Sequence, residues 1–148
     1  MSYAALTRRT QFAAAHRYRR PDWDDARNAA VFGLCARPNF HGHSYVCHVT
    51  VRGAIDEETG FCVDLGLLDR ILLEEVRERF DHRNLNLDVA EFADGRQIPT
   101  SENLARLIAA RVQARLGEAL GGGAPVVTRV VVAEDETLSV TFEPVCDD

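Results

Sequence analysis

The sequence contains no lysine, so its 17 permanently positive side chains are all arginine. This absence excludes every mechanism that needs a lysine nucleophile or a Schiff base on a lysine of this chain. It also means that an anionic ligand would have to be held by guanidinium groups, backbone amides or a metal ion. The net charge of −6 and the pI near 5.3 argue against a surface that binds nucleic acid.

Long apolar runs are also missing. No segment approaches the length of a membrane span, and Met1–Phe12 lacks the apolar core of a secretory signal. We therefore expect a cytoplasmic protein without membrane contact. Of the 148 residues, 46% are hydrophobic and 27% are charged, which predicts a single globular domain over residues 1–148.

Cysteine is scarce, with four residues and no C-x-x-C pair, so a disulfide framework is the poorer interpretation. We interpret Cys62 and Cys146 as buried core thiols. Cys35 differs, because it lies in the glycine- and proline-marked segment FGLCARPNF before His41. Its thiol could be a nucleophile or a general base beside a metal, or it could be a fourth metal ligand. An inert thiol fits so polar a segment least well.

The spacing of apolar residues predicts four main strands. Alternation places them at Leu6–His16, His41–Gly53, Val126–Glu134 and Thr137–Glu143, with Leu138, Val140 and Phe142 directed inward in the last strand. A short returning strand is expected to begin at Phe61–Val63.

Two helices are predicted between these strands. The first runs from an N-cap at Asp64 to Phe80, and the second begins near Thr100 or Ser101 and ends at the glycines of residues 121–123. The polar stretches 17–40 and 81–99 are expected to be irregular. Together these elements predict an α+β fold, in which an antiparallel sheet carries two helices on one face.

Three of the five histidines could form one metal site. His41 and His43 are two residues apart in an extended segment, so both project from the same face. His16 ends the first predicted strand and reaches this pair if the two strands are neighbours. Three neutral imidazoles with an open fourth position describe a catalytic zinc site, although H-x-H alone is also an ordinary strand pair. His48 has the opposite parity and should point away.

Five motifs, in order along the chain, resemble those of the 6-pyruvoyl-tetrahydropterin synthases and the related bacterial 6-carboxy-5,6,7,8-tetrahydropterin synthases. They are FAAAH at Phe12–His16, CARPNFHGHSY at Cys35–Tyr45, DHRNLN at Asp81–Asn86, PTSEN at Pro99–Asn103 and VVVAE ending at Glu134. The resemblance implies a tunnelling-fold (T-fold) subunit with a four-stranded antiparallel sheet and two helices packed on one face.

The resemblance also implies roles for residues in all five motifs. The zinc ligands would be His16, His41 and His43, the catalytic residues Cys35, Asp81 and His82, and the pterin-binding residues Glu134, Thr100 and Glu102. Arg17, Arg19 and Arg20 follow the first ligand and could meet a triphosphate.

Some of these residues also have simpler interpretations. Asp135 follows Glu134 where the family commonly has threonine, so Glu136 is the alternative pterin anchor. Taken alone, Asp81-His82 is typical of a helix C-terminus followed by a turn, and Glu102 of a carboxylate that stabilises a helix N-terminus.

The implied activity is that of a zinc-dependent lyase acting on 7,8-dihydroneopterin triphosphate. We prefer 6-carboxy-5,6,7,8-tetrahydropterin as the product, with acetaldehyde and triphosphate released, as in deazapurine (queuosine-type) biosynthesis. This preference rests on arginine without lysine and abundant alanine, a composition typical of a GC-rich bacterium. The alternatives are a 6-pyruvoyl-tetrahydropterin synthase and a non-catalytic module that binds zinc and pterin. The resemblance further implies a homohexamer, a dimer of trimers with active sites at subunit interfaces.

Overall fold

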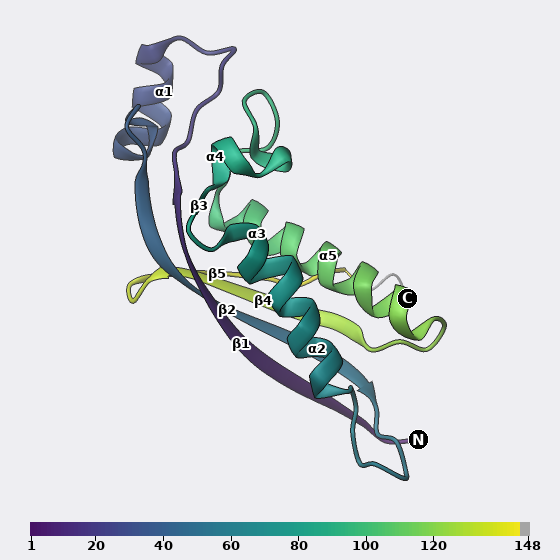
Figure 1. Cartoon of the computed structure of the whole chain (residues 1–148). Helices are drawn as coiled ribbons and strands as arrows, with labels where there is room; N and C mark the ends of the chain where they lie inside the picture. Colours follow the sequence, from purple (N-terminus) through teal and green to yellow (C-terminus); the bar gives the residue numbers. More distant parts are fainter. Residues whose placement is uncertain (146–148) are drawn as a thin grey trace.

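The structure, a computed structural model, describes residues 1–145, so Cys146 lies outside the described residues. A twisted five-stranded sheet with the order β3-β1-β2-β4-β5 forms one layer, and helices cover one of its faces (Figure 1). This arrangement confirms the predicted α+β fold.

The sheet is built on a long antiparallel ladder between β1 (Tyr3–His16) and β2 (His41–Ala54). β4 (Val126–Asp135) pairs with β2, and β5 (Leu138–Phe142) pairs with β4, both antiparallel. The fifth strand, β3 (Arg83–Asn84), pairs in parallel with β1 and corrects the predicted number of four. Two residues are too few to carry an alternating pattern, so the sequence contains no signal for this strand.

In β1 and β2, every second side chain near the site lies on the face of the sheet that the helices cover. Buried side chains on this face include Phe12, Ala14, His16, Tyr45, Cys47, Val49 and Val51. The aromatic rings of Phe12 and Tyr45 stack across the two strands with centroids 4.8 Å apart. Cys47 is fully buried in this core, whereas Cys62 is half-buried and packs at its margin.

The first predicted helix is continuous but not uniform. α2 (Leu65–Leu72) begins after Asp64, whose side chain accepts a hydrogen bond from the Leu67 N–H, as a helix N-cap does. A π-helical turn, η2 (Leu73–Arg77), leads into α3 (Glu78–Phe80). The hydrophobic spacing indicates the helix but not the π turn within it.

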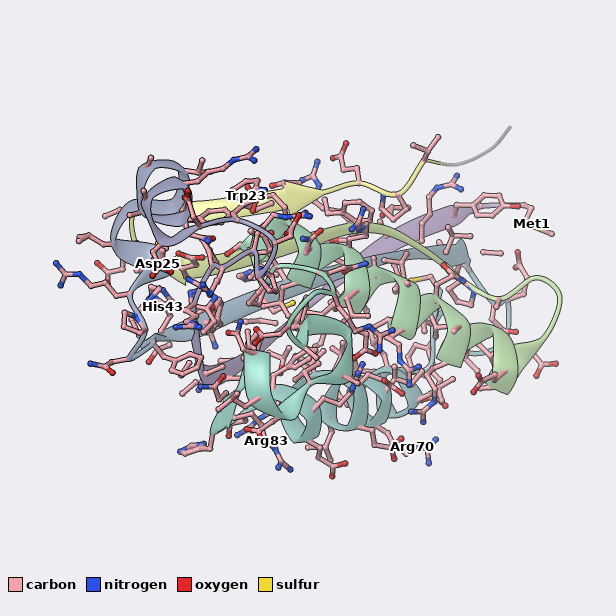
Figure 2. All side chains as sticks on the ribbon, turned by 90° about the horizontal axis from the view of Figure 1, so that it is seen from above. Met1, Trp23, Asp25, His43, Arg70 and Arg83 are labelled. Atoms are coloured by element: carbon pink, nitrogen blue, oxygen red, sulfur yellow. The ribbon has the colours of Figure 1, made fainter. Side chains whose placement is uncertain are left out.

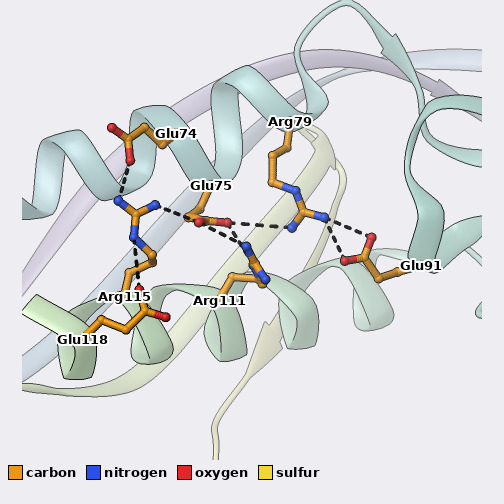
Figure 3. A network of polar contacts seen from close by, with 7 residues as sticks. All are labelled: Glu74, Glu75, Arg79, Glu91, Arg111, Arg115 and Glu118. Atoms are coloured by element: carbon orange, nitrogen blue, oxygen red, sulfur yellow. Dashed lines mark hydrogen bonds and ion pairs between the residues drawn. The ribbon is translucent and has the colours of Figure 1, made fainter.

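The second predicted helix is α5 (Ser101–Leu120), and the Thr100 hydroxyl caps its first turn. In Figure 1, α2 and α5 lie on the same face of the sheet, as predicted. A cluster of ion pairs joins η2 to α5, in which buried Glu75 contacts Arg111 and Arg115 (Figure 3). None of the helices in residues 1–145 has the length and apolar character needed to cross a membrane.

The stretches expected to be irregular contain short helices. Residues 17–40 include α1 (Asp25–Phe32) and the 3-10 turn η1 (Gly33–Ala36), and residues 81–99 include α4 (Leu85–Asp88) and η3 (Ala90–Phe92). In Figure 1, α1 stands beyond the ends of β1 and β2. Asn28 is the one buried residue of α1, so this helix has no apolar stripe from which it could be predicted.

Two further expectations are wrong. Phe61–Val63 forms no strand, because the Asp56 N–H donates to the Phe61 carbonyl and closes a turn there. Leu138 is 49% exposed rather than inward, since it lies where β5 leaves the β4–β5 turn. Val140 and Phe142 are half-buried, and Phe142 packs against the core.

Candidate functional site

The three histidines of the predicted metal site meet where β1 ends and β2 begins. His16 pairs with His41 in the register of the two strands, and His43 follows two residues later on the same face. One potential ligand atom from each ring lies within 4.8 Å of the other two. In Figure 2, His43 lies toward the end of the molecule away from Met1.

Hydrogen bonds to His16 determine which of its ring nitrogens is free. Its Nδ1 lies 2.8 Å from the Pro99 carbonyl and 3.1 Å from the Tyr45 hydroxyl. A carbonyl can only accept, so Nδ1 carries the proton and Nε2 keeps its lone pair. Nε2 of His16 and Nε2 of His43 are buried and have no hydrogen-bond partner within residues 1–145. A metal ion would satisfy both atoms, and the Pro99 carbonyl would orient the His16 ligand.

The charge state of the cluster also suits a metal. Burial lowers the pKa of His16 to about 4. Burial and the neighbouring His43 lower the pKa of His41 as well. The rings of His16 and His41 are therefore neutral near pH 7, as ligands to a divalent cation must be. His48 lies outside the cluster, as its parity predicts.

Cys35 lies in η1, half-buried, and its carbonyl accepts a hydrogen bond from the Tyr18 N–H at 2.8 Å. Its thiol is not part of the ligand cluster, which consists of the three histidines in the part of the chain described. Burial and the negative charge of Glu134 raise the pKa of the Cys35 thiol. A catalytic thiolate at this position needs a nearby positive charge, which a bound dication would supply.

Glu134 lies beside the histidines, near the end of β4, and is 9% exposed. Its Oε1 accepts hydrogen bonds from the Tyr18 hydroxyl at 3.1 Å and from the Ser101 hydroxyl at 2.8 Å. Its Oε2 lies 3.7 Å from Nε2 of His43. Glu136, the alternative anchor, is exposed in the following turn and lines the same cavity as His43 and Glu134.

At the start of α5, the residue that contacts Glu134 is neither Thr100 nor Glu102, the two that were expected to bind the pterin. The Thr100 hydroxyl accepts from the Asn103 N–H and so caps the helix, and Glu102 is exposed in the first turn. Ser101, between them, is the residue that contacts Glu134. The missed residues are therefore Ser101 and Tyr18. Ser101 belongs to the PTSEN motif, which marks the segment but not the contact with Glu134, and no sequence signal indicated Tyr18.

Asp81 and His82 form the expected pair directly after α3. Asp81 accepts from the Ala13 N–H through Oδ1 at 2.8 Å, and its Oδ2 lies 3.0 Å from Nδ1 of His82. His82 has a positive φ of 58° and a side chain that is 85% exposed. No hydrogen bond or ion pair within the described chain joins this pair to Cys35.

Asn86, from the same motif, holds the chain next to a histidine of the cluster. Its side chain accepts from the Arg17 N–H at 2.9 Å and donates to the Arg17 carbonyl at 3.0 Å. The Arg17 guanidinium lies over the Phe40 ring, while Arg19 and Arg20 pair with Asp25 and Asp22. All three arginines proposed for the triphosphate therefore have partners in this chain.

Comparisons with known proteins agree with this geometry. The family model for 6-pyruvoyl tetrahydropterin synthase matches residues 5–145. A 6-pyruvoyl tetrahydrobiopterin synthase from Pongo abelii is 41% identical over 102 residues, which are 69% of each chain. A 6-carboxy-5,6,7,8-tetrahydropterin synthase from Bacillus subtilis is 32% identical over 114 residues, 76% of this chain and 72% of that protein.

Solved structures give the same assignment. The 6-pyruvoyl tetrahydropterin synthase of Caenorhabditis elegans superposes with a TM-score of 0.87 at 30% identity, covering 98% of both chains. This likeness confirms the predicted T-fold. The higher identity to a pyruvoyl enzyme favours that activity over the carboxy product preferred from composition. The chain belongs to the 6-pyruvoyl tetrahydropterin synthase family.

Proposed function

We propose that this chain is a zinc-dependent 6-pyruvoyl-tetrahydropterin synthase that eliminates triphosphate from 7,8-dihydroneopterin triphosphate and keeps the side chain. The observation that carries the proposal is one end of the β1–β2 ladder, where three histidines, Cys35 and Glu134 gather. The 41% identity to a relative named for this activity supports it.

Recognition of the pterin ring is assigned to Glu134. An aminopyrimidine edge presents two N–H donors, and a carboxylate can accept both of them. Because Tyr18 and Ser101 both donate to Oε1, Oε2 keeps its accepting capacity for a ligand. Glu102 is a secondary candidate, since it is exposed at the start of α5. Thr100 contributes indirectly, by capping that helix.

His16, His41 and His43 would hold the zinc ion, whose chemistry when bound is that of a Lewis acid that polarises oxygen. In the proposed reaction the Cys35 thiolate removes a proton from a side-chain carbon of the substrate. His82 relays protons, and Asp81, 3.0 Å from its Nδ1, orients the ring. Loss of triphosphate and the hydrogen shift then reduce the ring without an external redox cofactor.

The proposed active site is shared between subunits. His82 is 85% exposed and has no link to Cys35 within residues 1–145, so a second copy would have to bring the two together. The sheet ends in the short edge strands β3 and β5, and exposed edges are usually covered or paired. We therefore propose the homohexamer, a dimer of trimers, as the active assembly.

Product analysis tests this proposal. Zinc-loaded protein is incubated with 7,8-dihydroneopterin triphosphate, and the pterin, acetaldehyde and triphosphate are measured. Triphosphate release with a diketone side chain is expected. Acetaldehyde would instead establish the carboxy activity, the second candidate, which the Bacillus subtilis relative favours. The absence of turnover in fully metallated hexamers would contradict both and favour a binding module.

A further inference from the structure

Tyr18 contacts three parts of the site, although it lies in a stretch without regular structure. Its ring is edge-on to the His16 ring, with centroids 5.0 Å apart. Its backbone N–H donates to the Cys35 carbonyl at 2.8 Å, and its hydroxyl donates to Oε1 of Glu134 at 3.1 Å. A single residue thus connects a histidine of the cluster, the cysteine-bearing turn and the carboxylate.

The backbone on both sides of Tyr18 is fixed by asparagine side chains. Asn86 makes two hydrogen bonds to the backbone of Arg17. Asn28, 1% exposed, accepts from the Arg20 N–H at 2.8 Å and donates to the Arg20 carbonyl at 3.0 Å. The Tyr18 ring also packs edge-on to the Phe32 ring at 5.9 Å. Since these contacts do not involve the hydroxyl, its removal should leave the ring and the backbone in place.

The hydroxyl therefore acts on Glu134 rather than on the fold around it. We propose that Tyr18 is a positioning residue for Glu134, whose carboxylate it holds together with Ser101 so that Oε2 stays available for the pterin. The two hydroxyls meet at one oxygen, Oε1, and leave Oε2 without a hydrogen-bond donor among the described residues. This inference rests on the proposed function, in which Glu134 binds the ring.

A carboxylate with a single donor can rotate about its Cγ–Cδ bond, whereas two converging donors restrict its plane. Fixing the acceptor before the ligand arrives removes an ordering cost from binding. The rotation matters here because Oε2 is only 3.7 Å from Nε2 of His43, so a released carboxylate can turn toward the metal ligands. The expected consequence is weaker pterin binding with little change in the chemical step.

The test is Tyr18→Phe, which keeps the ring and removes the hydroxyl. Binding is measured by fluorescence with neopterin, an oxidised pterin that lacks the triphosphate and cannot react. The lost hydrogen bond orders the carboxylate and does not contact the pterin, so binding should weaken by the cost of ordering one side chain, about threefold to tenfold. KM for the triphosphate substrate should rise by a similar factor while kcat changes less than about twofold. Zinc content and the thermal midpoint should stay unchanged. Tyr3→Phe, an exposed tyrosine far from the site, is the matched control.

A double-mutant cycle with Glu134→Ala separates positioning from a direct contact. Tyr18→Phe should have no further effect on neopterin binding or KM once the carboxylate is gone. Unchanged binding by the single Tyr18→Phe variant, a fall in kcat at constant KM, or equal weakening in both backgrounds would overturn the inference. If Glu134→Ala binds neopterin as tightly as the unmodified chain, the proposed role of Glu134 fails instead, and the inference fails with it.

Discussion

Replacing Glu75 by glutamine is expected to destabilise the fold by about 2 kcal/mol. Glu75 is 5% exposed and lies in the π turn η2, facing α5. Its Oε2 accepts from Nε of Arg111 at 2.9 Å, and its Oε1 accepts from Nη1 of Arg115 at 2.8 Å. Nη1 of Arg79 lies 3.9 Å from Oε2, so three guanidinium groups surround one carboxylate (Figure 3).

The solvent exposure of these arginines determines how much stability the Glu75→Gln substitution should cost. Removing one partner of a fully buried ion pair costs about 3–5 kcal/mol. The Arg111 side chain is 47% exposed and that of Arg115 is 28% exposed, so water can solvate both when the charge on Glu75 is lost. The glutamine amide also accepts one of the hydrogen bonds. We therefore expect about 2 kcal/mol, which for a domain of this size lowers the thermal midpoint by about 4–8 °C.

The effect should depend on pH. Burial raises the pKa of Glu75, but hydrogen bonds and charges from Arg111 and Arg115 outweigh it and hold the pKa below the ordinary value of 4.5. A carboxyl whose pKa is lowered by folding stabilises the protein above its unfolded-state pKa, and this contribution is lost as pH falls through the folded-state value. The difference in the free energy of unfolding between the unmodified protein and Glu75→Gln should therefore be largest at pH 7 and shrink below about pH 4.5.

Urea unfolding followed by circular dichroism measures this difference, with both proteins equally metallated. Glu118→Gln is the matched control, because the Glu118 side chain is 72% exposed and lies 3.9 Å from Arg115. It should cost less than about 0.5 kcal/mol. Equal losses for Glu75→Gln and Glu118→Gln, or a difference as large at pH 3 as at pH 7, would refute the reasoning.

Three further predictions concern the site. His41→Ala should lose zinc, measured by atomic absorption, together with turnover, whereas His48→Ala should keep both; a fully metallated and active His41→Ala protein would contradict the ligand assignment. Cys35→Ala should retain stoichiometric zinc and bind pterin but lose turnover, and loss of the metal would favour the fourth-ligand interpretation. Cys35→Ala and His82→Ala chains, unfolded together and refolded, should regain partial activity; mixed oligomers identified by differential tags but still inactive would exclude a shared site.

The parts of the fold that could be predicted are those in which large apolar side chains repeat along an element. Phe12 and Tyr45 lie on alternating strand positions, and both are buried. α1 could not be predicted, since its one buried residue is a polar Asn28 that binds backbone rather than core. β3 also escaped prediction, because its two residues become a strand only through pairing with β1.

The residues of the candidate site also fall into those that the sequence could predict and those that it could not. His41 and His43 could be paired from the sequence because strand parity directs both to one face. The contacts of Tyr18 and Ser101 with Glu134 could not be predicted from the sequence. They form only when an irregular segment, the start of α5 and the end of β4 come together in the folded chain. Residues on regular elements thus follow from periodicity, whereas contacts between irregular segments depend on the assembled fold.

A short series of contacts leads from the ion-pair cluster between η2 and α5 to the candidate metal site. Arg79 lies between Glu75 and Glu91, and its Nη2 donates to Glu91 at 2.8 Å. The Glu91 carbonyl accepts from the Gln97 N–H, which fixes the segment that leads to Pro99. The Pro99 carbonyl in turn binds Nδ1 of His16 and so selects the tautomer that leaves Nε2 free for a metal. Ion pairs and backbone hydrogen bonds thus hold, from α3 onward, the segment whose Pro99 carbonyl orients the histidine at the end of β1.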